Sequence, residues 1–508
     1  MMILKLFNST SAICPSQIKK RFLRLLAGYC LYVFSIALLA EQANIKTPFD
    51  SMPSYGPDLR YHYEIIEMKG ADIPELVGMP IEKIGLFALR ENILVPIPFQ
   101  FEERDQFGNT FFKQDSPIQG TLGIFDKNDA LLVFAEDAGD AIDHIGKNHN
   151  RLIGEIAVTR HTKGKTEKQK FFYAATEPNR VFKSPVDFDI KSGTVRTPLY
   201  TLFTAPDNFL VWKGLSFVPY QKQEQQVQQN VLNQQEKKGG NSKSTPEIDK
   251  LSAVPDSLLD SLKIRMKANV LPFFIPITMS NDDIESRIVE VQPGIIRQVI
   301  LVKSVVKVTG ITVARMLLRF YVSPQDINLH VRTRIPPSLG KLIVNSRATI
   351  SLDGNNLINS DVQTSLTENK QFQVDGIMSA AEKKIVNSIF DQNKIHWVAL
   401  DTHKNFSLVA KIGLPKNLGI DIKLLYVDDK NDADAPENFP GQLPNIGFSL
   451  SDIPENKDFD FFINLTFVDS LNNMTINDLA SVLNQPTTVQ FKRKEVMQAA
   501  LQHRTWAH

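Results

Sequence analysis

The chain has 508 residues, of which 43% are hydrophobic and 22% charged, with 57 basic and 56 acidic side chains. This composition is that of a folded protein with room for more than one core, and it excludes a largely disordered chain. A formal net charge of +1 argues against a nucleic-acid partner, and two cysteines exclude a disulfide scaffold or a cysteine-rich zinc module.

The first 40 residues predict a secretory signal peptide. Positions 1–24 carry five basic side chains and no acidic one, and an apolar run follows from Leu25 to Ala40. As a helix this run would span about 24 Å, less than the bilayer core of roughly 30 Å, which is typical of a signal peptide. The alternative is an uncleaved anchor.

Cleavage of this signal would change the chain in two ways. Both cysteines, Cys14 and Cys30, would be lost, and removal of five positive charges takes the net charge from +1 to −4. We therefore expect an exported protein of the periplasm or cell envelope, which is not an integral membrane protein once the signal is removed.

Most of the remaining chain predicts antiparallel β-strands, because apolar and polar residues alternate with period two between turn residues. The expected strands include 93–103, 131–135, 152–160, 171–175, 262–267, 298–308, 314–322, 327–335, 406–412, 420–427 and 459–468. Pro96 and Pro98 delete backbone donors on one side of the first of these, which predicts an edge strand or a strand at a domain border. Helices are expected only at 379–392, at 475–483 with Thr475 or Asn477 as cap, and at 492–508.

The composition suggests a division into two β-sandwich-type domains. Residues 219–254 are rich in Gln and poor in apolar side chains, so we expect a disordered linker there. The linker would separate an N-terminal β domain, 57–218, from a C-terminal β-sandwich, 255–470, which is followed by a partly helical tail, 471–508. One large sandwich with the linker as an insertion is the alternative.

Glu103 and Asp105 are the candidate catalytic pair. They follow a predicted strand and fall on the same side of it, where two carboxylates could act as acid and base in glycoside chemistry. The alternative is a surface ion-pair cluster with Arg104.

Acidic residues flank the expected strand 131–135 on both sides and suggest a calcium site. The candidate ligands are Asp126, Asn128, Asp129, Asp137 and Asp140. Ca²⁺ prefers six to eight oxygen ligands, although the spacing matches no EF-hand loop. The alternative is ordinary turn chemistry, in which Asp and Asn side chains bind the nearby backbone.

Two basic stripes and one aromatic pair are candidate ligand-binding surfaces. The stripes are Lys263, Arg265 and Lys267 on one strand and His330, Arg332 and Arg334 on another. If those strands pair, they form a cationic patch suited to the carboxylates or phosphates of a polysaccharide or lipid headgroup. His396 and Trp397, with His403 nearby, could stack on a sugar and bind its hydroxyl groups. The alternatives are a solvated outer face and a buried tryptophan.

Two functions from different classes remain open on the sequence alone. The first is a non-enzymatic exported protein that binds a glycan, a lipid or a protein partner, because the sequence has no nucleophile or strong metal motif. The second is a carbohydrate-active enzyme, a lyase, epimerase or hydrolase, that uses the paired carboxylates or histidines. A purely structural role is a third possibility, which predicts no small-ligand site.

Overall fold

The structure is a computed structural model that carries the protein chain alone. It describes residues 64–113, 118, 120–142, 151–159, 161–162, 165–166, 169–177, 182–217, 257–271, 273–308, 311–334, 343–367, 370–386, 388–391, 396–404, 406–413, 421–432, 439, 441, 443–451, 458–468, 475–483, 487–493 and 495. The predicted signal peptide and the Gln-rich segment lie outside these residues, so both stay predictions, as does the division into domains.

The all-β prediction is confirmed. The described residues form six sheets in which every strand pairing is antiparallel, and they include two α-helices, α4 (Ala380–Val386) and α5 (Ile476–Leu483). No helix in this part of the chain is long and apolar enough to cross a membrane.

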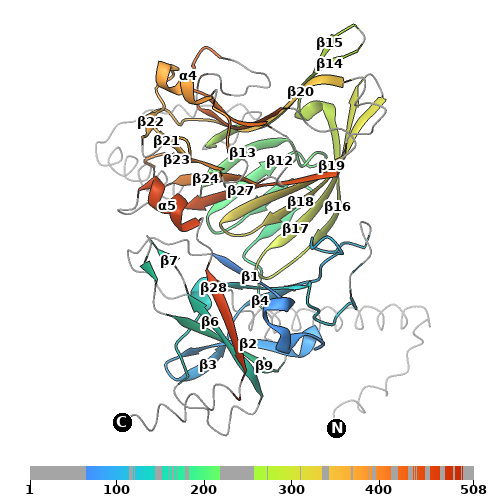
Figure 1. Cartoon of the computed structure of the whole chain (residues 1–508), viewed down its shortest axis with the longest axis vertical. Helices are drawn as coiled ribbons and strands as arrows, with labels where there is room; N and C mark the ends of the chain where they lie inside the picture. Colours follow the sequence, from blue (N-terminus) through green and yellow to red (C-terminus); the bar gives the residue numbers. More distant parts are fainter. Residues whose placement is uncertain are drawn as a thin grey trace, which may run out of the picture. The chain divides into compact units, whose positions relative to one another are not determined.

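The largest sheet has nine strands and lies at the centre of Figure 1. Its strands, in spatial order, are β16 (Ile284–Gln292), β17 (Gln298–Val308), β18 (Ile311–Val322), β19 (Asp326–Arg334), β27 (Asp458–Val468), β24 (Ser407–Gly413), β23 (His396–Asp401), β21 (Asp361–Thr364) and β22 (Phe372–Gln373). Side chains alternate between its two faces. Both faces carry apolar residues, so both require a covering layer.

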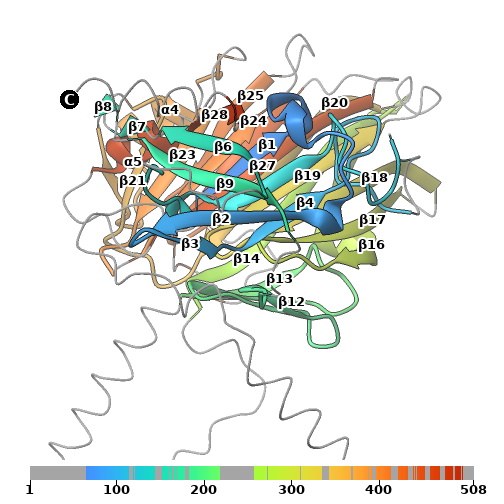
Figure 2. The ribbon, with the colours of Figure 1, turned by 90° about the horizontal axis from the view of Figure 1, so that it is seen from below.

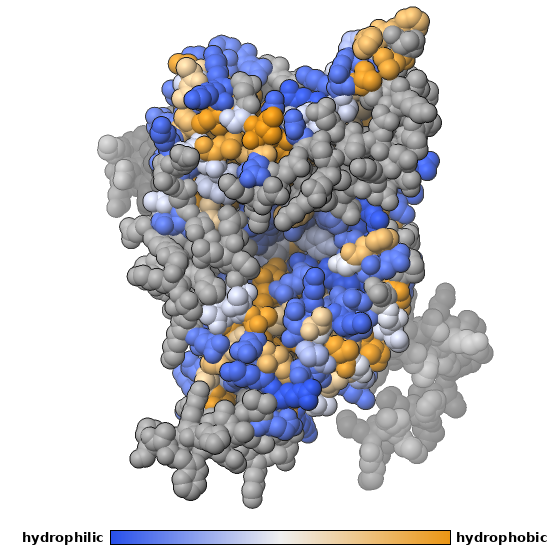
Figure 3. Space-filling view, in the orientation of Figure 1, coloured by the Kyte–Doolittle hydropathy of each residue, from blue (hydrophilic) through white to orange (hydrophobic). Residues whose placement is uncertain are grey.

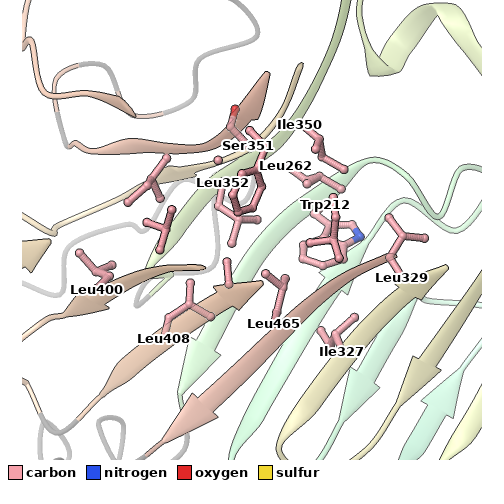
Figure 4. A pocket seen from close by; sticks show the side chains of 16 residues that line it. Trp212, Leu262, Ile327, Leu329, Ile350, Ser351, Leu352, Leu400, Leu408 and Leu465 are labelled. Atoms are coloured by element: carbon pink, nitrogen blue, oxygen red, sulfur yellow. The ribbon is translucent and has the colours of Figure 1, made fainter. Parts of the chain in front are cut away.

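A five-stranded sheet covers part of one face, which we call the inner face. Its strands are β15 (Ile275–Met279), β14 (Leu259–Val270), β20 (Ile343–Gly354), β26 (Asn445–Ser451) and β25 (Asp421–Val427). Leu352 and Phe448 point from this sheet toward Leu329 and Leu465 of the nine-stranded sheet, as Figure 4 shows for the labelled leucines. The two sheets therefore form a sandwich, whose outer surface is the far face of β14, β20 and β26.

A four-stranded sheet covers another part of the same inner face. It consists of β10 (Asp187–Asp189), β11 (Thr194–Arg196), β12 (Tyr200–Thr204) and β13 (Trp212–Phe217). Three aromatic pairs join the two layers, Tyr200–Phe467, Phe209–Phe320 and Phe217–Phe406, with ring centroids 4.6–4.8 Å apart. Contacts of this kind bury large apolar areas, so this sheet contributes to the same core.

The other face of the nine-stranded sheet meets a smaller sandwich, which lies in front of it in Figure 2. One layer has β1 (Ile65–Lys69), β5 (Ala130–Phe134) and β4 (Phe99–Glu102), and the other has β28 (Thr488–Arg493), β6 (Leu152–Thr159), β9 (Lys170–Thr176), β2 (Ile84–Arg90) and β3 (Ile93–Pro96). A short hairpin, β7 (His161–Thr162) with β8 (Lys165–Thr166), adds to it. The two layers enclose one apolar core, which includes Met68, Leu131, Leu86 and Phe172.

Five of the predicted strands agree closely with the structure. The bounds of β17 are those expected, 298–308, and β6, β9, β25 and β27 match within one or two residues. The expected strand 93–103 is instead two strands, β3 and β4, which lie at the edges of two different sheets. Pro96 ends β3, an edge strand, as predicted. Pro98 lies in the gap before β4, and its missing backbone donor explains the break.

The three helix predictions had different outcomes: one was too long, one matched and one was wrong at its start. The expected helix 379–392 is limited to α4. At α5 the side-chain oxygen of Thr475 accepts from the amide of Asp478 at 3.1 Å, which confirms Thr475 as the cap. The helix expected from Lys492 is wrong at its start, because Lys492 and Arg493 belong to β28 and pair with β6.

A buried ion pair joins the small sandwich to the nine-stranded sheet. Glu102 at the end of β4 is fully buried and accepts two bonds of 2.7 Å from Arg297, which lies just before β17. Arg104 is 3.0 Å from the same carboxylate, and Thr110 donates to it. Burial would raise the pKa of Glu102, but the two guanidinium groups outweigh burial and hold it below its ordinary value.

The same junction carries backbone contacts. The side-chain oxygen of Gln100 accepts from the amides of Ile296 and Arg297, at 2.9 and 3.0 Å. Gly294 allows this approach, because a Cβ there would lie 2.1 Å from that oxygen. The guanidinium of Arg297 also lies over the ring of Tyr321, 4.6 Å from its centroid. Glu102, Gln100 and Arg297 thus fix how the outer face is covered.

We predict that Glu102→Gln lowers the free energy of unfolding by about 3 kcal/mol, because it leaves two buried guanidinium groups with one carboxylate fewer. Glu67→Gln is the matched control, since Glu67 contacts the same Arg104 and Arg297 but is more than one-third exposed, and it should cost less than about 1 kcal/mol. Urea denaturation measures both. Because folding lowers the pKa of Glu102, the stability that its carboxylate contributes is lost as pH falls. The difference in unfolding free energy between the wild type and Glu102→Gln should therefore shrink in acid.

Candidate functional site

A polar hollow of about 300 Å³ lies on the outer surface of the five-stranded sheet. Its lining comes from β14, β20, β25 and β26 and from one loop: Arg265, Lys267, Arg347, Thr349, Ser351, Leu425, Val427, Asp432 and Asn445. These residues share a face because each strand contributes every second side chain. The hollow therefore combines three cations, two hydroxyl groups and an amide with a single carboxylate.

Two of the cations are direct cross-strand neighbours. Lys267 of β14 pairs in register with Arg347 of β20, and both side chains are exposed. Directly opposed side chains on one sheet face have Cβ atoms about 5 Å apart, and like charges in that position destabilise the sheet. Among the described residues, neither side chain forms an ion pair; Arg347 donates from Nε to the hydroxyl oxygen of Ser449 at 2.7 Å. An anion bound between them would relieve this repulsion.

An amide completes the polar lining. The side-chain oxygen of Asn445 on β26 is buried and accepts no hydrogen bond in the described part of the chain. A buried acceptor without a partner costs free energy, which a donor such as a ligand hydroxyl would recover. Asp432 lies in the same lining as the only carboxylate. The hollow can thus hold a negative group of a ligand, while the Asn445 side-chain oxygen accepts a hydrogen bond from a ligand hydroxyl.

The two predicted basic stripes do not combine. β14 and β19 belong to different sheets, so the condition for a shared cationic patch is not met. Lys263 and Arg265 are buried, Lys263 in an ion pair of 2.6 Å with Asp353. On β19 the Arg332 guanidinium lies 3.9 Å from the ring centroid of Phe107 in the small sandwich. His330 is on the same strand, half-buried, and the side chain of Arg334 lies outside the described residues.

His396 and Trp397 share no surface, because neighbours on a strand face opposite sides. His396 is buried, with its ring nitrogens 2.6 Å from the carbonyl oxygen of Asp391 and 3.1 Å from the hydroxyl oxygen of Ser365. It also stacks on Phe390. Trp397 packs in a core cluster with residues of α5. Both are under one-tenth exposed, which is the geometry of core residues.

Glu103 and Asp105 have different partners. Glu103 accepts from the amide of Gly123 at 2.7 Å. Asp105 is buried, caps the following turn through the amides of Phe107 and Asn109, and lies 3.5 Å from the guanidinium of Arg319. The turn and the ion pair account for Asp105, and the catalytic pair stays a prediction.

The candidate calcium ligands lie at the two ends of β5. Asp126 and Asp129 precede the strand and bind backbone amides: Asp126 accepts from Asn128 and Asp129 accepts from Arg104. Asp137 and Asp140 follow it, and a five-residue strand separates the ends by about 17 Å. No group of three or more acidic or histidine side chains in the described residues is placed to hold a metal ion. A calcium site stays a prediction.

Asp137 is a buried carboxyl with an unusual proton affinity. One of its oxygens has no hydrogen-bond partner in the described part of the chain, and the other is 3.4 Å from Arg90. Burial raises the pKa of Asp137 to about 7, although Arg90 partly opposes this rise. The group is therefore partly protonated near neutral pH.

We predict that Asp137→Asn removes a pH-dependent loss of stability. The folded protein binds this proton more tightly than the unfolded chain, so wild-type stability falls as pH rises from 3.8 to about 7. The free energy of unfolding of the variant should rise relative to that of the wild type across that pH range, by up to a few kcal/mol above neutral pH. Thermal unfolding of both proteins at several pH values measures this. A difference that is constant with pH would contradict it.

A second, apolar cavity of about 40 Å³ lies inside the sandwich (Figure 4). Sixteen residues from both sheets and from β13 line it, among them Leu262, Leu400, Leu408 and Leu465. The indole nitrogen of Trp212 is buried without an acceptor among the described residues. At this size the cavity holds little more than a water molecule or two, so it is a packing gap of the core rather than a ligand site.

Comparisons with known proteins do not identify a family. No protein-family model and no curated protein matches the sequence. An α-mannosidase from Enterococcus faecalis V583 aligns with 85% of this chain and 44% of its own, at 6% identity and a TM-score of 0.41. The α-N-acetylgalactosaminidase NagBb from Bifidobacterium bifidum aligns with 54% and 36%, at 10% identity and 0.28.

A copper-containing benzylamine oxidase from Hansenula polymorpha aligns with 85% of this chain and 80% of its own, at 10% identity and a TM-score of 0.28. The chain spans less than half the length of the α-mannosidase and of NagBb. TM-scores this low say nothing about the activity of this chain.

Proposed function

We propose that the protein is an exported envelope or periplasmic binding protein that holds an anionic glycan in the polar hollow of its five-stranded sheet. The observation that supports this is the cross-strand pair Lys267 and Arg347, two exposed like charges with no acidic partner among the described residues. A carboxylate, sulfate or phosphate group of the ligand would bind between them.

The rest of the lining favours a glycan over a bare anion. Thr349, Ser351 and Asn445 present hydroxyl and amide groups on the same face as the cations. Hydroxyl-rich ligands need such donors and acceptors, and the volume of about 300 Å³ is at the lower end of small-ligand sites. A uronic acid or sulfated sugar unit has both chemical features, a negative group and several hydroxyl groups.

Binding without turnover fits this hollow better than hydrolysis. Glycoside hydrolysis ordinarily requires two carboxyl groups on opposite sides of the bond, and Asp432 is the only one in the lining. The carbohydrate-active enzyme remains the second candidate through Glu103 and Asp105, whose side chains have other partners described above.

We predict that Lys267→Ala with Arg347→Ala weakens binding of tetragalacturonate at least roughly tenfold, the equivalent of about 1.4 kcal/mol. Isothermal titration should show binding by the wild type that weakens with salt and is absent for the neutral maltotetraose. The matched control is Lys213→Ala with Arg287→Ala, an exposed lysine and an exposed arginine on β13 and β16, which should bind as the wild type does.

The same samples test the enzymatic alternative. Mass spectrometry of the sugar after incubation should recover intact tetragalacturonate. Shorter or unsaturated products that disappear in a Glu103→Gln variant would overturn the binding proposal in favour of the enzyme. Equal affinity of the two double variants would show that the hollow is not the binding site.

A further inference from the structure

The hairpin of β14 and β15 ends in an exposed aromatic tip. Phe273 and Phe274 are 81% and 59% exposed. Figure 1 draws β14 and β15 projecting at the top of the molecule, and Figure 3 shows an apolar tip at the same place. Two adjacent phenyl rings in water at a projecting tip are unfavourable for a free protein, since each would gain about 1.5–3 kcal/mol on burial.

The tip is also free of charge. Residues 268–281 include no Asp, Glu, Lys or Arg, and the nearest charged residues are Lys267 and Asp282. Edge hairpins of isolated proteins ordinarily carry charges or other features that prevent association. A stretch of 14 uncharged residues with Leu271, Phe273 and Phe274 at its turn is the reverse of that pattern.

The backbone at the tip holds the rings outward. Phe274 has φ of 51°, in the left-handed region that bulky residues rarely adopt. Such a conformation costs free energy, and residues held in it cluster at functional sites such as ligand clamps. It places two successive phenyl rings at the end of the hairpin, where neither packs into the core of the chain.

We propose that this tip inserts into the interfacial layer of a lipid bilayer and holds the protein at a membrane surface. A projecting, uncharged aromatic tip matches a soft apolar layer, because aromatic rings are favoured at the boundary of headgroups and acyl chains. A groove on a partner protein would ordinarily select for polar contacts around the rings as well, and the tip has no charged residue to make them.

The geometry keeps the polar hollow clear of the bilayer. Lys267 and Arg265 lie three and five residues before the end of β14 at Val270, or about 10 and 17 Å along the strand, and the turn with Phe273 lies beyond that end. Insertion of the tip by about 5–10 Å would leave the hollow above the headgroups. The inference therefore stands apart from the proposed glycan binding, and either could fail without the other.

The experiment places a fluorescent residue at the tip of the full chain. Phe273→Trp is mixed with phosphatidylcholine vesicles whose acyl chains carry bromine, which quenches tryptophan only at close contact. The control is Ile93→Trp, at a comparably exposed apolar position of 65% on β3. We expect quenching of the tip tryptophan beyond that of the wild type, and none beyond it for the control. This readout is unaffected by any separate attachment of residues 1–40 to the vesicle.

A second measurement tests the nature of the contact. Because the tip is uncharged, quenching should persist in neutral vesicles at about 0.5 M salt, where exposed charges are screened. Phe274→Ser in the Phe273→Trp background should reduce it at least roughly threefold, and Lys267→Ala should leave it unchanged. No quenching, equal quenching at position 93, or quenching lost with salt and with Lys267→Ala would each overturn the proposal. So would a wild-type dimer that Phe273→Ser with Phe274→Ser converts to a monomer.

Discussion

A β-sheet with apolar residues on both faces must be covered on both, and this constraint organises the whole structure. The inner face of the nine-stranded sheet is covered by two other sheets through apolar and aromatic contacts, which need no exact orientation. The outer face is covered by the small sandwich, and there Glu102 and Arg297 fix the position. A buried, doubly bonded ion pair tolerates little displacement, so it sets where the outer layer lies.

This arrangement separates the cations of the chain into two kinds. Arg297, Arg104 and Arg319 lie at the covered face and serve as partners of buried carboxylates. Lys267 and Arg347 lie on the outer surface of the five-stranded sheet, where neither forms an ion pair among the described residues, although Asp432 lies in the same lining. The cationic side chains at the covered face are explained by their ion pairs with buried carboxylates. The exposed pair has no such explanation, and the proposed function rests on that pair.

Local patterns in the sequence predicted most of the strands, but the site required pairing between distant segments. The apolar, mostly β-branched residues of 298–308 are enough to predict β17, because such residues favour strands. The alternation of side chains along a strand says that Glu102 and Glu103 face opposite sides, yet only the position of Arg297 shows which of them is buried. Lys267 and Arg347 are 80 positions apart in the chain, and nothing local in the sequence states their register.

The predictions were wrong where residues close together in the sequence were expected to share one surface. His396 and Trp397 are consecutive, so a strand necessarily points them to opposite faces, and both became core residues. The acidic residues around β5 are close in sequence but lie at opposite ends of a strand. Residues that are close in sequence are also close in space when a tight turn joins them. On a strand, immediate neighbours face opposite sides, and residues at its two ends lie far apart.

The pairing of β28 with β6 links residues 488–493 to residues 154–159 within one ladder. Val489 and Phe491 are half-buried and pack against the core of the small sandwich, and Arg493 forms an ion pair with Glu75. This sandwich therefore lacks one of its strands until residues 488–493 have been synthesised. Until then the edge of β6 is an open template for other strands, which makes the nascent chain dependent on protection from aggregation. Among the described residues, the final strand along the chain is thus the one that completes the sandwich to which the earliest strands belong.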